Sequence, residues 1–144
     1  MRGITALIAA TLCAANIPAI GKPTAPDHPI VGTWRITIPL QDGSCDEIYR
    51  IRADGTTFVT SADEISESEF EISDAPSQKG FYKLVDTITK DNGKKDCLGE
   101  IMQVGQAATN YVLFHESGDM FLMCREERLA TCIGPFIRQK DSDA

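Results

Sequence analysis

The chain has 144 residues and is acidic, with 14 lysine and arginine residues against 21 aspartate and glutamate residues and a formal net charge of −7. This length suits one domain with a modest core and is too short for two ordinary domains. The acidic balance argues against nucleic acid and against anionic membrane surfaces as partners, because both attract clusters of basic side chains. We interpret the acidity as a source of solubility.

The first 21 residues have the pattern of a secretory signal peptide. One cationic residue precedes the uncharged stretch 4–20, and Ala19 and Gly21 supply the small side chains of a cleavage site. An uncleaved membrane anchor is the alternative, but this stretch of roughly 17 residues is at the short limit for a span and contains Pro18. We therefore predict cleavage near Gly21 and a periplasmic or secreted protein without a membrane attachment.

The rest of the chain divides into three unequal parts. Residues 22–30 contain three prolines and no hydrophobic periodicity, which indicates an extended leader with His28 in solvent. Residues 31–138 carry the alternating patterns of strands and are expected to form a single β-barrel domain. Residues 139–144 are polar, and we predict a disordered tail.

The first two predicted strands form a hairpin. Residues 33–40 alternate apolar with polar side chains and lead through a turn into the strand 45–51. In the second strand, Tyr49 and Ile51 are the natural inward pair, which places Glu47 at the mouth of the barrel.

Further short alternating runs follow, with turn residues between them. Residues 97–104 fit either a strand or a loop. About eight strands without an amphipathic helix predict an all-β, antiparallel up-and-down barrel, with a sandwich as the alternative. The further strands are expected at 56–61, after a loop or short helical turn within 63–73, and at 81–90, 110–115, 120–125 and 132–138.

Four cysteines follow the predicted cleavage point. An even number in an exported chain predicts two disulfides, whereas a zinc site would need a close Cys-x-x-Cys spacing that the sequence lacks. Counting strands places Cys45 and Cys97 at one end of the barrel and Cys124 and Cys132 at the other. Of the three possible pairings, we therefore prefer Cys45 with Cys97 and Cys124 with Cys132.

Gly32-Thr33-Trp34 on the first strand and Arg138 on the last resemble the pattern of the lipocalin-like group of the calycin superfamily. In that group a tryptophan of the first strand plugs the closed end of the barrel, and a basic residue near the C-terminus packs over its indole. The resemblance implies these two roles for Trp34 and Arg138. The acidic second motif of true lipocalins and their late helix are not evident. The whole chain also resembles small exported proteins of Gram-negative bacteria.

No motif in the chain points to a reaction. His115 lies on a predicted strand without the elbow of a nucleophile–histidine relay. Glu47 and Asp86 could form an acid–base pair, but nothing in the sequence fixes their separation. The segment 91–93 with Asp96 lacks the EF-hand spacing and reads as an Asn-Gly turn. We predict a protein that is not an enzyme and that needs no metal and no cofactor.

The predicted inward aromatic and aliphatic side chains leave two possibilities open. They either line a cavity for a ligand or fill a solid core. The leading hypothesis is a barrel that binds a small apolar molecule without chemistry. The alternative is an inhibitor of the protease or lysozyme type, which binds an envelope protein through a loop in 63–74 or around Asn92. The candidate cavity residues are Tyr49, Phe58, Phe70, Leu113 and Phe121.

Overall fold

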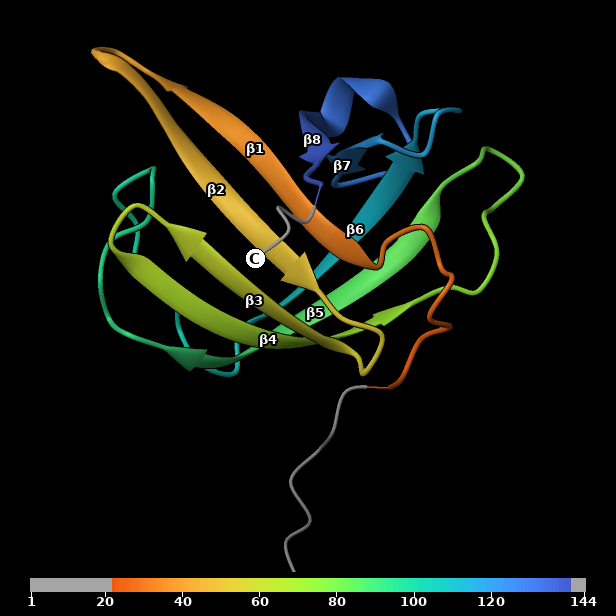
Figure 1. The fold of residues 1–144 in the computed structure, drawn as a ribbon, viewed down its shortest axis with the longest axis horizontal. Helices are drawn as coiled ribbons and strands as arrows, with labels where there is room; N and C mark the ends of the chain where they lie inside the picture. The colour runs from red at the N-terminus through yellow and green to blue at the C-terminus, as the bar shows by residue number, and fades with distance from the viewer. Residues whose placement is uncertain (1–21, 141–144) are drawn as a thin grey trace, which may run out of the picture.

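Residues 22–140, which the computed structural model describes, form a closed barrel of eight antiparallel strands (Figure 1). Strands that are neighbours in the chain are neighbours in the barrel, and the last strand pairs with the first. This confirms the predicted all-β, up-and-down architecture. The strands are β1 (Gly32–Leu40), β2 (Gly43–Ile51), β3 (Thr56–Ser61), β4 (Glu64–Ile72), β5 (Tyr82–Asp91), β6 (Ala107–Phe114), β7 (Met120–Cys124) and β8 (Cys132–Arg138).

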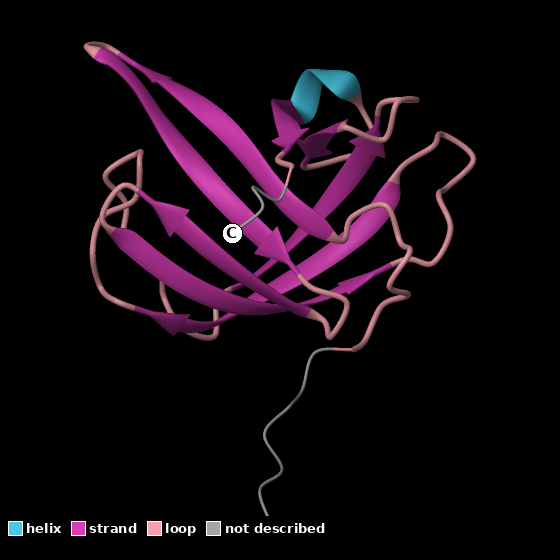
Figure 2. Cartoon of the chain, viewed as in Figure 1, coloured by secondary structure: helices cyan, strands magenta, loops and turns pink. Residues whose placement is uncertain are grey.

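Helical structure in this part of the chain is limited to one 3-10 turn, η1 (Leu129–Thr131), between β7 and β8 (Figure 2). None of the described residues belongs to a helix long and apolar enough to cross a membrane. The predicted signal peptide and residues 141–144 of the predicted tail lie outside the described residues. Gln139 continues beside β1, because its backbone N–H donates to the carbonyl oxygen of Thr33 at 2.8 Å.

The strands differ from the sequence prediction in two places. β4 occupies the whole of Glu64–Ile72, where we expected a loop or helical turn before the strand. Its inward positions include Ser66 and Ser68, so small polar side chains concealed the alternation of burial that the barrel imposes. Residues 92–106 form a loop, which resolves the open interpretation of 97–104.

One end of the barrel, which we call the plugged end, is closed by aromatic packing around Trp34. The indole of Trp34 is fully buried, and its Nε1–H donates to the carbonyl oxygen of Ile30 at 2.8 Å. Phe121 packs edge-on against this indole, with ring centroids 4.7 Å apart, and stacks on Phe136 at 4.6 Å. Arg138 covers the indole from outside, with its Cζ atom 4.0 Å from the ring centroid.

The leader packs across the plugged end instead of running free in solvent. His28 is 7% exposed, so the expectation of a solvated histidine was wrong. Its Nδ1 atom accepts a hydrogen bond from the backbone N–H of Ile30 at 3.2 Å, and its Nε2 atom lies 3.2 Å from the carbonyl oxygen of Ser73. The ring also packs edge-on against Tyr82. These contacts hold the leader against the plugged end of the barrel.

Both disulfides lie at the opposite end, which we call the disulfide end. The pairs are Cys45–Cys97 and Cys124–Cys132, as predicted. Their predicted location at opposite ends was wrong. Every strand pairing is antiparallel, so β2 and β8, which hold Cys45 and Cys132, both start at this end. The error arose because the segment 97–104 was counted as a strand. One additional strand reverses the direction of every later strand and so moves Cys124 and Cys132 to the other end.

Candidate ligand-binding cavity

The barrel interior contains a cavity of about 160 Å³ beside the aromatic plug. The six strands β2 to β7 contribute to its wall. The wall combines apolar side chains with a carboxyl, an amide and three hydroxyl groups. The lining residues are Tyr49, Ile51, Thr57, Val59, Ser68, Phe70, Leu84, Asp86, Asn110 and Met123.

Strand register brings the polar side chains of the wall together. Cross-strand pairs share a face of the sheet, and Ser68 pairs with Thr57 while Asp86 pairs with Phe70. The pairing of β4 with β5 shifts register next to Ser68. The hydroxyl of Ser68 then donates to Oδ1 of Asp86 at 2.6 Å. A β-bulge changes the direction of nearby side chains, and here it lies next to Ser68 in the cavity wall.

Burial shapes the ionisation of the groups in and beside the cavity. It raises the pKa of Asp86, and the hydrogen bond from Ser68 opposes this rise in part. The pKa of Tyr49 is also raised, first by burial and then by the nearby carboxyl of Glu47, with smaller contributions from Asp86 and Glu64. The hydroxyl of Tyr49 therefore stays protonated and acts as a hydrogen-bond donor.

A wider cleft of about 700 Å³ lies against the cavity on the side of the β7–β8 connection. Asn110 and Met123 line both spaces. The cleft and the cavity therefore adjoin at these two side chains. The remaining residues of the cleft are Arg125, Glu126, Ala130, Thr131, Cys132 and Ile133.

The predicted cavity residues fall in three different places. Tyr49 and Phe70 line the cavity. Phe121 faces inward but belongs to the aromatic plug, where it is 1% exposed. Phe58 lies on the outer face under the guanidinium of Arg50, and Leu113 lines a hollow on the outer surface. Phe58, Leu113 and Phe121 are thus corrections to the predicted lining.

Sequence reasoning did not select the polar part of the wall. Asp86 alternates with Tyr82 and Leu84 along β5, and this pattern was the available signal for an inward position. Both faces of this strand mix polar and apolar residues, so the sequence does not show which face is inward. Ser68 and Asn110 carried no comparable signal.

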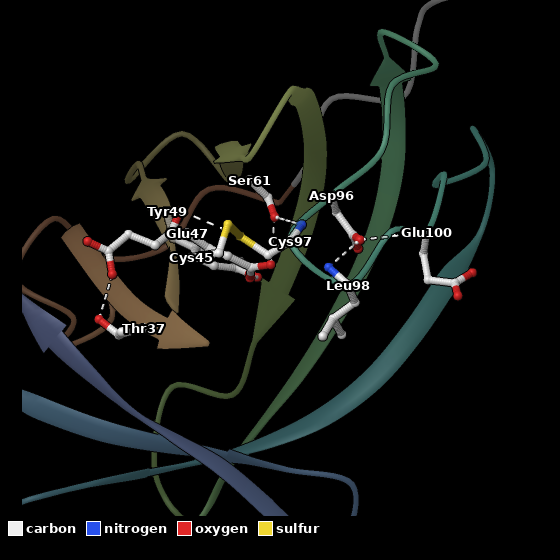
Figure 3. Close-up of a disulfide and its surroundings, with 10 residues drawn as sticks. Thr37, Cys45, Glu47, Tyr49, Ser61, Asp96, Cys97, Leu98 and Glu100 are labelled. Atoms are coloured by element: carbon white, nitrogen blue, oxygen red, sulfur yellow. Dashed lines mark hydrogen bonds between the residues drawn. A yellow bond between two sulfur atoms is a disulfide. The ribbon is translucent and has the colours of Figure 1, made fainter. Parts of the chain in front are cut away.

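Glu47 connects the interior to the loop 92–106 (Figure 3). Its carboxylate accepts hydrogen bonds from the hydroxyls of Tyr49 at 2.8 Å and Ser61 at 2.6 Å. The Ser61 oxygen in turn accepts the backbone N–H of Cys97 at 2.9 Å. Glu47 and Asp86, the possible acid–base pair of the sequence analysis, thus have different hydrogen-bond donors, Tyr49 and Ser61 for Glu47 and Ser68 for Asp86.

Glu64 is a second buried carboxyl near the disulfide end. It is 3% exposed, and its Oε1 atom is buried without a hydrogen-bond partner among the described residues, as is Oδ2 of Asp91. Burial raises the pKa of Glu64 to about 7, with further contributions from Asp91, Asp96 and Glu47. A proton held between Glu64 and Asp91 would satisfy both oxygens.

The loop 92–106 presents apolar side chains to solvent from a fixed base. Leu98, Ile101 and Val104 are 65%, 52% and 63% exposed. The Cys45–Cys97 disulfide ties the loop to β2, and Oδ1 of Asp96 accepts the backbone N–H groups of Leu98 and Glu100, each at 2.8 Å (Figure 3). The loop is therefore shaped locally before any partner binds.

Comparisons of the chain with protein-family models, with curated proteins and with solved structures find no match.

Proposed function

We propose that this protein is a lipocalin-like, non-enzymatic binding protein of the periplasm or the extracellular space that holds a small molecule in its interior cavity. The observation that carries the proposal is the interior cavity, which adjoins a wider cleft at Asn110 and Met123. The plug of Trp34 under Arg138 supports the lipocalin-like interpretation, because it closes one end of the barrel. Two disulfides suit an oxidising compartment.

The size of the cavity limits the ligand. An apolar cavity of about 150 Å³ in an engineered protein binds benzene, so a space of about 160 Å³ accepts a body of about one ring. A longer ligand would extend past Met123 into the cleft. The apolar part of the ligand would contact Phe70 and Leu84, while the polar wall is available for one hydrogen-bonding group.

The test is a binding titration with one-ring aromatic compounds and short fatty acids, followed by calorimetry and by amide chemical shifts. Met123→Trp should fill the entrance and lower the affinity at least about tenfold. Met120→Trp is the matched control, because Met120 lines the hollow on the outer surface, and it should leave binding unchanged. Absence of saturable binding by every probe, or normal binding by Met123→Trp, would reject the proposal.

The loop 92–106 favours a second candidate function, an inhibitor of the protease or lysozyme type. Its exposed apolar side chains stand on a base fixed by a disulfide, which suits docking to an enzyme. Inhibition assays with purified envelope proteases and lysozymes test it. Leu98→Asp should abolish inhibition, and Leu129→Asp should not, because Leu129 is 64% exposed outside this loop. No inhibition of any of these enzymes would exclude this function.

A further inference from the structure

The cavity wall has one carboxyl group and no basic side chain. Asp86 is its acidic residue, and lysine, arginine and histidine are absent from the lining. Asp86 takes part in no ion pair among residues 22–140. Its hydrogen-bond partner is the neutral hydroxyl of Ser68. A half-buried carboxylate with only a neutral partner leaves most of its charge uncompensated.

Other groups beside the cavity do not supply the missing positive charge. Arg125 lines the adjoining cleft together with Glu126, but it does not line the cavity. Strand register places Glu47 and Glu64 on either side of Ser61, on one face of the sheet, and both side chains are buried. Glu47 accepts hydrogen bonds from the hydroxyls of Tyr49 and Ser61, both of which are neutral. The ionisable carboxyl groups in and beside the cavity therefore have no cationic partner, which favours a cationic guest over an anionic one.

We propose that the ligand of this cavity carries a protonated amine or an equivalent small cationic group that pairs with Asp86. This inference rests on the proposed binding function and specifies its ligand class. The ammonium group would donate to the Asp86 carboxylate beside Ser68, while the apolar body of the ligand packs on Phe70 and Leu84. The aromatic ring of Tyr49 offers a further favourable contact to a cation.

Matched pairs of amines and alcohols test the inference. We would titrate the full mature protein at neutral pH with benzylamine and benzyl alcohol, then with phenethylamine and phenethyl alcohol, by calorimetry. Each amine should bind about 10- to 100-fold more tightly than its alcohol, which is the usual range for a charge-assisted hydrogen bond in a partly desolvated site. Amine binding should also lower the pKa of Asp86, measured by carbon-13 chemical shift.

Two variants with the same change of charge complete the design. Asp86→Asn should remove the preference for the amine, and it should fold because an amide replaces a buried carboxyl of equal size. Glu71→Gln is the control on the exposed outer side of β4 and should keep the preference. A thermal melt verifies that both variants are folded.

The outcomes separate this inference from the proposed function. If alcohols bind as tightly as amines, the cationic ligand class is rejected. If the preference for amines persists in Asp86→Asn, the pairing of the ligand with Asp86 is rejected. In both cases the binding function stands. If neither amines nor alcohols bind, and no other one-ring compound does, both are rejected.

Discussion

Arg138 lies over the indole of Trp34, with its Cζ atom 4.0 Å from the ring centroid, and the same guanidinium ties down the leader. Its Nη1 and Nη2 atoms donate to the carbonyl oxygens of Val31 and Pro29 at 2.9 and 2.8 Å. Arg138→Ala should lower the free energy of unfolding by about 2 to 4 kcal/mol, measured by urea denaturation, since it removes the cation–π contact and these hydrogen bonds.

Arg50→Ala is the matched control for that prediction. Arg50 also lies over an aromatic ring, with its Cζ atom 5.7 Å from the centroid of Phe58, but on the outer face of the barrel. Its removal should cost less than about 1 kcal/mol, because an exposed cation–π contact is weak. Equal losses for Arg50→Ala and Arg138→Ala would contradict a special role for Arg138.

Gly32 makes room for the same guanidinium. A Cβ atom at this position would collide with Nη1 of Arg138, and the backbone φ of Gly32 is +143°. Gly43 has a similar φ of +139° with open space around it. Gly32→Ala should therefore destabilise the protein by about 1 to 3 kcal/mol more than Gly43→Ala, a difference that thermal melts can measure. Similar effects at both glycines would show that backbone strain alone matters.

Truncation of Trp34 tests the plug itself. Trp34→Ala should lower stability by about 3 to 5 kcal/mol, as large core truncations do. Trp34→Phe keeps most of the volume but loses the hydrogen bond to Ile30, so it should cost about 1 to 3 kcal/mol. Urea denaturation followed by circular dichroism gives both values. An unchanged urea midpoint for Trp34→Ala would show that the plug does not contribute to stability.

Glu64 should make stability depend on pH in the acidic to neutral range. Its pKa is about 7 in the folded protein against 4.5 in the unfolded chain. Between these values the folded state keeps a proton that the unfolded chain has lost, so stability falls as pH rises through this window. The fall from this group is about 3 kcal/mol and is complete above neutral pH.

Glu64→Gln should flatten this dependence, because glutamine stays neutral, and should make the protein more stable than wild type at pH 8. The matched control is Glu67→Gln on the outer face of β4, where Glu67 pairs with Lys90. Chemical denaturation at several pH values measures both. A slope in Glu64→Gln equal to that of wild type would assign the pH dependence to other groups, among them Asp86, whose raised pKa acts in the same direction.

The two disulfides should differ in their contribution to stability. Cys45–Cys97 spans 52 residues and Cys124–Cys132 spans 8. In the chain-entropy treatment, the longer link constrains the unfolded chain more, by about 1 to 2 kcal/mol. Replacing the first pair by alanine should therefore lower the melting temperature more than replacing the second. The opposite order would indicate that local contacts of η1 dominate.

The sequence predicted the strands well because a barrel wall imposes a period of two on each strand. The prediction that Cys124 pairs with Cys132 was correct despite the error in strand count, because these two residues flank the same hairpin at either end of the barrel. The face of a strand was harder to predict. In β3 the large Phe58 suggested the interior, yet Thr57 and Val59 face it, since the register with β2 and β4 decides the face.

The cavity was the least predictable feature, for a physical reason. Its polar wall depends on which side chains meet across strands that are distant in sequence, such as Ser68 and Asp86, and on a register shift that no local pattern announces. Asp86 was noted only as a member of a hypothetical acid–base pair. A buried carboxyl in a small barrel is an exception to the usual burial preference, so composition alone would not select it.

Both covalent links lie at the disulfide end, whereas the plugged end is held by aromatic packing and hydrogen bonds. The two ends therefore respond to different agents. Thiol reductants act on the region of the loop 92–106 and η1 while leaving the plug intact, and amide hydrogen exchange under reducing conditions should quicken there first. Without its two disulfides the chain would thus keep an ordered plugged end and lose order at the disulfide end, so that the barrel would loosen from one side only.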